Sequence, residues 1–298
     1  MRINYKTCLE HGLFTDDIKA LNFVAGHDLL SNDCYCGDDC PGILVFKKDS
    51  RFCYGTCLHC PVCKRDCSIF EGSIFTRTKL PVTKVLELIY FWSKGTGVLE
   101  TAHETGINKN TVTNFFQALR DACGEWIDIN NAKKIGGIGN TVEIDETLMV
   151  KRKSNQGRIL PEIWVVGGIC RETNECFATV VADRTATTLQ QVIQENVVVG
   201  TTINTDMWGG YRNINTLGYV HKVVNHSQNF INPVDGTHTQ KIERFWRGLK
   251  DIRKKYQGIP KSEIESHIFE YLWRRTKKVS YKNCFEEAIY MLSDVQFK

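Results

Sequence analysis

Cysteine is concentrated in one short stretch of this chain. Thirteen cysteines occur in 298 residues, and eight of them lie between residues 34 and 67. The total is odd, and the first thirty residues contain no basic block followed by an apolar one. Both observations argue against a disulfide framework and for a protein that stays inside the cell. The stretch therefore predicts metal binding, because clustered thiolates are ligands of structural zinc.

Two pairs of cysteines have the spacing that a tetrahedral zinc ion needs. Cys60 and Cys63 are separated by two residues, which lets two thiolates on one tight turn meet the ion at ~2.3 Å. A second pair is needed about twenty residues earlier, and we choose Cys36 and Cys40. This separation predicts a zinc ribbon over residues 31–78. Three further cysteines are close enough to substitute for members of the set: Cys34, Cys53 and Cys57.

Length and hydropathy are those of an ordinary folded protein. The chain is 42% hydrophobic and 24% charged, and its length predicts two domains, with room for a small third module. The longest apolar stretch, residues 86–92, is interrupted by Glu87 and is far shorter than the ~20 residues of a membrane span. We therefore expect no contact with a membrane.

Residues 79–132 have the periodicity of helices. Pro81 opens a helix over residues 81–95, Gly106 closes a short helix that follows, and Asn108 is placed to cap a third. Two helices joined by a tight turn with glycine predict a DNA-binding helix-turn-helix, although an ordinary helical hairpin gives the same pattern. The residues that the second helix would carry toward a groove of DNA are Asn110, Thr111, Thr113 and Asn114.

The pattern changes after a glycine-rich linker at residues 133–140. Three β-branched runs predict consecutive strands, and a helix, a strand, a short helical segment and a fifth strand follow, before long helices from Thr239. This order predicts a mixed α/β sheet in which the first and fourth strands can be neighbours. The predicted strands cover residues 141–150, 162–170, 175–183, 201–206 and 219–226. Beyond the ribbon, the expected domains are a helical segment (1–30), the helix-turn-helix region (79–132), a catalytic domain (140–258) and C-terminal helices (259–298).

Positive charge is concentrated near the end of the chain. Residues 240–282 contain thirteen Lys or Arg and five Asp or Glu, whereas the whole chain has a net charge of only +4. Aromatic residues are interleaved with the basic ones. Such a surface can neutralise phosphates, although a solvated helix face gives the same composition.

Three acids lie at positions from which their side chains could converge in the predicted fold. Asp145 lies inside a predicted strand, Asp206 ends another, and Glu243 sits early in a helix. If they converged without a cation, each pair would repel by up to ~4 kcal/mol at about 4 Å and an effective dielectric near 20. Carboxylate oxygens are hard ligands, so the trio predicts two Mg²⁺ or Mn²⁺ ions that assist phosphoryl transfer. The alternative is that each acid merely caps a helix or pairs with a nearby cation.

Several blocks of sequence resemble one family. VEIDET (142–147), INTDMWGGY (203–211) and HTQKIERFWRGLK (238–250) closely resemble the catalytic domain of Merlin-type DDE transposases and their bacterial insertion-sequence relatives. The resemblance covers about residues 30–260, and 61 positions separate the first two acids. It implies a ribonuclease-H-like domain with Asp145, Asp206 and Glu243 as its metal-binding triad, preceded by a zinc ribbon.

The same resemblance implies further roles. His226 and His238 would contact the scissile phosphate or orient a water molecule, and Asp183 is the rival to the triad that we interpret as a helix cap. The residues that would face the DNA backbone are Arg244, Arg247 and Lys250. The expected protein is a transposase that cleaves and joins double-stranded DNA at terminal inverted repeats, as a homo-oligomer. It would act in the nucleus if the host is eukaryotic and in the cytoplasm otherwise. The alternatives are a non-catalytic DNA-binding protein derived from a transposase and a structure-specific nuclease.

Overall fold

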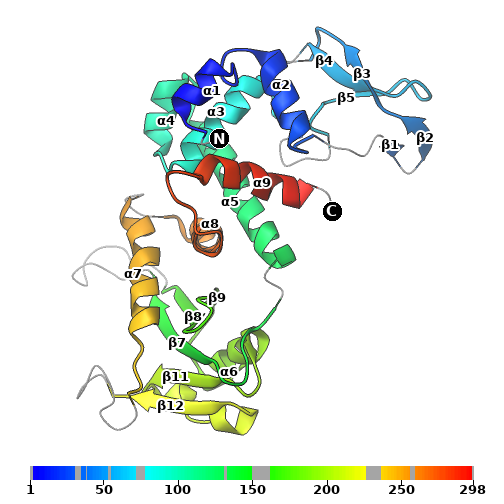
Figure 1. Ribbon diagram of the computed structural model, residues 1–298. Helices are drawn as coiled ribbons and strands as arrows, with labels where there is room; N and C mark the ends of the chain where they lie inside the picture. Colours follow the sequence, from blue (N-terminus) through cyan, green and yellow to red (C-terminus); the bar gives the residue numbers. More distant parts are fainter. Residues whose placement is uncertain are drawn as a thin grey trace. The chain divides into compact units, whose positions relative to one another are not determined.

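The computed structural model divides into two compact units (Figure 1). The helical unit comprises residues 1–129 and 277–298, and the sheet unit comprises residues 130–276. None of the described helices combines the length and the apolar character needed to cross a membrane. The residues that the structure describes are 3–30, 35–37, 39–52, 55–71, 78–130, 133–149, 162–225, 236–255 and 259–296.

Helix α3 is the centre of the helical unit. Leu86, Leu88 and Ile89 are fully buried, and α3 packs against α2, α4 and α9. A turn at Gly106, whose φ of 69° lies in the left-handed region, separates α4 from α5. The side chain of Asn108 accepts a hydrogen bond from the backbone N–H of Asn110 at the start of α5. The helices of this unit are α1 (Tyr5–Glu10), α2 (Asp17–Gly26), α3 (Val82–Ser93), α4 (Val98–Thr105), α5 (Lys109–Asn130) and α9 (Cys284–Gln296).

The cysteine-rich stretch forms short strands. One hairpin pairs β1 with β2, and a separate antiparallel sheet has the order β3-β4-β5. These strands are β1 (Tyr35–Gly37), β2 (Cys40–Ile43), β3 (Val45–Lys48), β4 (Thr56–His59) and β5 (Asp66–Cys67).

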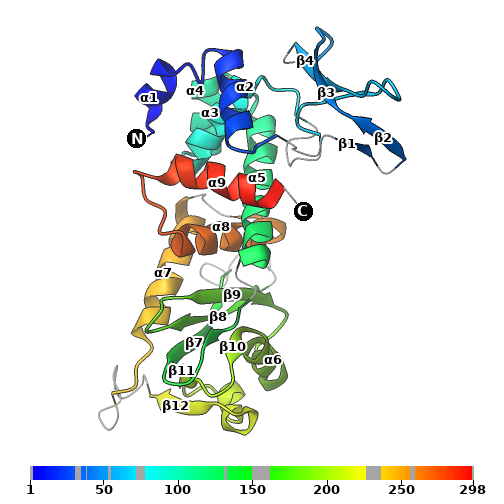
Figure 2. The same ribbon diagram turned by 45° about the vertical axis from the view of Figure 1, so that its right-hand side comes forward.

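The sheet unit is built on five strands in the order β12-β11-β7-β8-β9 (Figure 2). Strands β7, β8 and β9 pair antiparallel, whereas β11 is parallel to β7 and β12 is parallel to β11. This is the strand order of a ribonuclease-H-like fold, so the predicted fold class is confirmed. The strands are β7 (Thr141–Leu148), β8 (Trp164–Cys170), β9 (Cys176–Val181), β11 (Thr202–Asp206) and β12 (Val220–Val224); the short strands β6 (Ile135–Gly136) and β10 (Val197–Val198) pair beside them.

Helices cover both faces of this sheet. On one face, a hydrophobic core that includes Ile144 and Val166 packs against Leu189 and Ile193 of α6. On the other face lie α7, which contacts β7 and β8, and α8, which contacts β9. The helical segments are α6 (Ala186–Asn196), η1 (Gly209–Tyr211), η2 (Ile214–Leu217), α7 (Gln240–Lys255), η3 (Lys261–Glu263) and α8 (Ile264–Thr276). The predicted segment of C-terminal helices thus contributes α8 to the sheet unit and α9 to the helical unit.

Two consecutive glycines let both faces of β8 be approached closely. A Cβ atom at Gly167 would lie 2.5 Å from the Trp246 ring of α7, and one at Gly168 would overlap the ring of Phe177. Successive residues of a strand point to opposite faces, so the absence of side chains at these two positions admits an aromatic ring on each side.

Candidate active site and zinc cluster

Asp145 and Asp206 lie on neighbouring strands. The parallel pairing of β7 and β11 aligns Asn204 with Glu143, and the two aspartates come two residues later on each strand. A step of two residues keeps a side chain on the same face of a sheet. The pairing stops at Asn204, and the charge of Asp206 acts on Asp145, so the two carboxylates lie near each other at the end of β11.

Burial and charge change the chemistry of Asp145. Burial, followed by the negative charges of Glu146 and Asp206, raises the pKa of Asp145 to about 7. The Nε1 of Trp246 donates a hydrogen bond of 3.0 Å to its Oδ2 and partly opposes this shift. A buried carboxylate whose ionised form is disfavoured suits a divalent cation, whose charge would stabilise that form.

Asp206 ends β11 and begins a turn. Its Oδ1 accepts a hydrogen bond of 2.9 Å from the backbone N–H of Trp208. That bond occupies one carboxylate oxygen and fixes the orientation of the side chain at the end of the strand.

Glu243 lies near the start of α7, as predicted. Ile242, Phe245 and Leu249 of that helix are buried, whereas Glu243 is exposed and its Oε1 accepts a hydrogen bond of 3.4 Å from Thr239. Within the part of the chain that the structure describes, the three acids do not form a cluster in which one oxygen from each lies within 4.8 Å of the other two. The geometry thus brings Asp145 and Asp206 together and leaves Glu243 at the rim.

A fourth acid, Glu146, was not predicted as part of this region. Burial raises its pKa, and Tyr211 donates a hydrogen bond of 2.7 Å to its Oε2. Arg184 lies 3.5 Å away from its Oε1 and stacks over the rings of Trp164 and Trp208, at 4.5 and 4.0 Å from their centroids. The sequence signal was the second acid in Asp145-Glu146, which strand alternation assigns to the opposite face.

The two predicted histidines have different outcomes. His226 lies outside the described residues. The Nδ1 of His238 lies 3.4 Å from Oε1 of Glu143, and burial is the main cause that lowers the pKa of His238. Its catalytic role stays a prediction. Asp183, the rival acid, is exposed and accepts hydrogen bonds from Thr185 and Thr188 at the start of α6, which fits the helix-cap interpretation.

The four cysteines chosen for zinc come together in space. One sulfur from each of Cys36, Cys40, Cys60 and Cys63 lies within 4.8 Å of the others. The Cys36 and Cys63 sulfurs are 3.3 Å apart, and those of Cys40 and Cys60 are 3.7 Å apart. A tetrahedral zinc ion with bonds of ~2.3 Å separates its sulfur ligands by about 3.8 Å. The cluster is therefore compatible with zinc.

The cysteines held as alternatives do not join this cluster. Cys34 and Cys53 lie outside the described residues. The sulfur of Cys57 instead lies near the carboxylates of Asp49 and Asp66. Those acids already pair with Arg51, at 2.6 and 2.8 Å, so their charge is compensated without a metal.

The predicted DNA contacts are on two helices. Asn110 and Asn114 are exposed on α5, and Thr111 and Thr113 are partly exposed. The basic residues predicted to face the DNA backbone are all exposed on α7: Arg244, Arg247 and Lys250. These positions are accessible to a ligand, and their contacts with DNA stay predictions.

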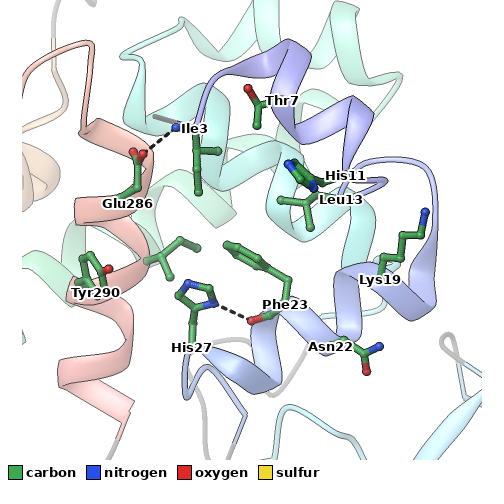
Figure 3. Close-up of a pocket in the computed structure, with 11 residues that line it drawn as sticks. Ile3, Thr7, His11, Leu13, Lys19, Asn22, Phe23, His27, Glu286 and Tyr290 are labelled. Atoms are coloured by element: carbon green, nitrogen blue, oxygen red, sulfur yellow. Dashed lines mark hydrogen bonds between the residues drawn. The ribbon is translucent and has the colours of Figure 1, made fainter. Parts of the chain in front are cut away.

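A separate pocket lies in the helical unit (Figure 3). It has a volume of about 580 Å³, and α1, α2 and α9 contribute to its lining. Phe23 and Leu13 contribute apolar walls, and His27 donates or accepts a 2.9 Å hydrogen bond with the carbonyl oxygen of Phe23. None of the predicted catalytic acids lines this pocket.

Comparisons with known proteins relate part of the chain to transposases. Residues 137–276 match the ISXO2-like transposase domain family. An uncharacterized transposase-like protein of Haemophilus influenzae is 30% identical over 101 residues, which are 33% of this chain and 78% of that protein. Membership of the Merlin-type branch and a nuclear location stay predictions.

Solved structures of retroviral integrases also resemble part of the chain. The catalytic core domain of BIV integrase has a TM-score of 0.32 and 17% identity, over 45% of this chain and 81% of that one. The HTLV-2 integrase catalytic core domain in complex with magnesium has a TM-score of 0.29 and 15% identity, over 48% and 87%. On the family match and the Haemophilus relative, this chain belongs to the ISXO2-like transposase family.

Proposed function

We propose that this protein is a DNA transposase that cleaves DNA at the terminal inverted repeats of a mobile element and joins the freed ends to target DNA. The observation that carries the proposal is the placement of Asp145 and Asp206 on neighbouring parallel strands, each two residues beyond the last paired position, where burial and the adjacent acids raise the pKa of Asp145 to about 7. In a site of this kind, two ionised carboxylates are more stable with a divalent cation bound between them than without one.

The residues fit a hard divalent metal. Asp145 and Asp206 would hold Mg²⁺ or Mn²⁺, and Glu243 would complete the site from α7. Bound metal supplies the positive charge that stabilises the attacking and leaving oxygens of an in-line phosphoryl transfer. The indole of Trp246 would hold Asp145 in one orientation. Arg247 and Lys250, exposed on the helix that carries Glu243, would bind phosphates of the DNA backbone.

The other modules would select the DNA. The four-cysteine cluster would hold a structural zinc ion, and α5 would present Asn110 and Asn114 to a groove. Bringing two DNA ends together requires two copies of the site. We therefore propose that the active form is a homo-oligomer assembled on DNA.

Cleavage and joining of labelled oligonucleotides test the proposal. Double-stranded repeat ends are incubated with Mg²⁺ or Mn²⁺, and nicked and joined products are separated on a denaturing gel. We expect Asp145→Asn, Asp206→Asn and Glu243→Gln to abolish both products while DNA binding persists. Asp183→Asn, which changes an exposed acid at the start of α6, is the matched control and should remain active. Normal activity in the Asp145 or Asp206 variant would refute the assigned roles.

Two other outcomes would replace this proposal. Specific DNA binding without nicking in either metal would indicate a non-catalytic DNA-binding protein. Cleavage that follows the shape of a DNA junction and never yields joined strands would indicate a structure-specific nuclease.

A further inference from the structure

Glu143 is a charged residue at a buried strand position, where an apolar residue is usual. It is the third residue of β7, and its side chain is fully buried, at 0% exposure. Burying a carboxylate without partners is costly, so a native structure retains one only where charges and hydrogen bonds compensate it. The partners of Glu143 therefore indicate its role.

Those partners include the start of α7. The Oε2 of Glu143 accepts hydrogen bonds from the backbone N–H groups of Lys241 and Ile242, at 2.8 and 3.1 Å. The first N–H groups of a helix have no partner within the helix, and negative charge is favoured beside them. A residue 98 positions earlier in the chain thus caps α7 from the neighbouring strand.

Arg171 joins the same network. Its Nε donates to Oε1 of Glu143 at 2.7 Å, and its Nη2 donates to the carbonyl oxygen of His238 at 2.6 Å, just before α7. The Nζ of Lys241 donates in turn to the side chain of Asn174, at 3.0 Å, in the turn between β8 and β9. The buried negative charge is compensated, and the start of α7 is held from two sides.

A second contact fixes how α7 lies along β7. Trp246, four residues after Ile242, bonds to Asp145, two residues after Glu143. Four residues of helix rise by about 6 Å, and two residues of strand advance by about 6.7 Å, so these steps match. The helix is attached to the strand at two points, and Glu243 lies between them.

We infer that Glu143 is a positioning residue, which caps and docks α7 so that Glu243 is held beside the strand that carries Asp145. This inference rests on the proposed function, because the position of Glu243 affects catalysis only if Glu243 completes the metal site. Glu143 does not bind the substrate in this scheme. It acts through the backbone of α7.

The test compares Glu143→Gln, Glu143→Ala and a matched control, Glu172→Gln. Glu172 also accepts a backbone hydrogen bond in this sheet, from Thr141 at 2.9 Å, but not from α7. Hydrogen exchange of a peptide spanning residues 240–246 reports docking without any need for activity. Single-turnover cleavage at saturating DNA, titrated with Mg²⁺, reports catalysis, and fluorescence anisotropy reports DNA affinity.

In Glu143→Gln, we expect exchange in this peptide to become about tenfold faster, because the bond to Arg171 loses its charge while one amide oxygen still accepts from the helix. Cleavage should slow by about 10–100-fold and need more Mg²⁺, with DNA affinity changed less than about twofold. Glu143→Ala should show still faster exchange in this peptide and still slower cleavage, so glutamine at this position partly preserves the function of the glutamate. Glu172→Gln should match the wild type.

Exchange and Mg²⁺ dependence equal to the wild type in a folded Glu143→Gln protein would overturn the inference, as would a rate loss matched by an equal loss of DNA affinity. If the alanine variant fails to fold, the glutamine variant still decides. If the wild type cleaves no DNA, the proposed function fails separately. In that case, faster exchange in Glu143→Gln would still support docking by Glu143, and unchanged exchange would overturn it.

Discussion

The indole Nε1 of Trp246 donates a hydrogen bond of 3.0 Å to Oδ2 of Asp145, across 101 positions of the chain. The bond joins the helix that carries the third acid to the strand that carries the first. It also stabilises the ionised form of the carboxylate, because the indole can only donate.

Trp246→Phe keeps a ring over Gly167 and removes this donor. We expect the pKa of Asp145 to rise further above 7, so that the acidic limb of the cleavage rate against pH shifts upward by about 0.5–1 unit, which corresponds to one hydrogen bond of about 1 kcal/mol. The measurement is single-turnover cleavage between pH 6 and 9. Trp273→Phe, on α8, removes a similar volume from the same unit and should leave that limb in place.

Asp145→Asn should stabilise the protein at pH 8 in the absence of metal. The pKa of Asp145 is about 7 in the folded chain and near 3.8 in the unfolded one, so the folded state holds an extra proton between these values. Stability therefore falls as the pH rises through this window, by an upper bound of about 4 kcal/mol. Since the side chain is partly exposed, we expect a gain of about 1–3 kcal/mol at pH 8 and almost none at pH 4.

Urea unfolding at the two pH values measures this gain. Asp183→Asn is the control of opposite sign, because hydrogen bonds from Thr185 and Thr188 lower the pKa of Asp183 and its charge stabilises the fold above pH 4. A loss of stability in the Asp145 variant at pH 8 would contradict the raised pKa. Added Mg²⁺ should raise the Tm of the wild type and not that of Asp145→Asn.

Removal of one cysteine from the four-sulfur cluster should abolish zinc binding. Cys60→Ser is the most direct change, since the backbone N–H of Cys63 lowers the pKa of Cys60 to about 6 and favours the thiolate that zinc binds. Elemental analysis should give one zinc per wild-type chain and none for the variant. Cys57→Ser, outside the cluster, should keep the metal. Zinc-free wild-type protein that folds normally in chelator would contradict this prediction.

Gly167→Ala and Gly168→Ala should both lower stability but should differ in their effect on activity. Each adds a methyl group to β8, at a cost of about 1–3 kcal/mol from overpacking. At Gly167 the methyl meets Trp246, so we expect cleavage to fall by more than the loss of folded protein explains. At Gly168 it meets Phe177 on the other face, and activity per folded molecule should be kept. Equal specific activities, measured after correction for the folded fraction, would contradict the coupling of α7 to the site.

Two exposed residues should affect DNA binding in different ways. Arg247→Ala, on α7, should weaken binding to all sequences and reduce the slope of log affinity against log salt by about 1. Asn114→Ala, on α5, should reduce the preference for the terminal repeat and leave that slope unchanged. Anisotropy titrations with repeat and scrambled duplexes at several salt concentrations separate the two. A change of slope for Asn114→Ala would place that side chain on phosphate instead.

The sequence predicts the architecture well where its signals are local. The strands predicted at 141–150 and 162–170 correspond to β7 and β8, because β-branched runs bounded by charged segments indicate strands; each observed strand is two residues shorter than predicted. The left-handed turn at Gly106 could also be predicted from a local signal, because a glycine directly after a helical segment is typical of a helix end. The predicted proximity of the first and fourth strands is confirmed, since β7 pairs with β11.

The sequence does not indicate which residues pair with the buried acids. VEIDET contains three acids, and alternation separates Glu146 from the other two, but nothing local indicates that Arg171 binds Glu143 or that Arg184 approaches Glu146. Those arginines follow 28 and 38 positions later, at the ends of other strands. Long-range pairing, and not residue type, decides which acid has a structural partner and which is left for a ligand.

The contact between Trp246 and Asp145 also sets when the site can exist during synthesis. Chains emerge N-terminal end first at about 5–20 residues per second, so the 101 positions between these residues take about 5–20 s. Until then, the face of β7 that α7 covers has no helix packed on it. The pairing of β7 with β11 is also non-local, and non-local pairing forms slowly. A nascent chain therefore carries both aspartates before the helix that bonds to Asp145 has been made, and the proposed metal site cannot be complete until α7 has emerged and docked.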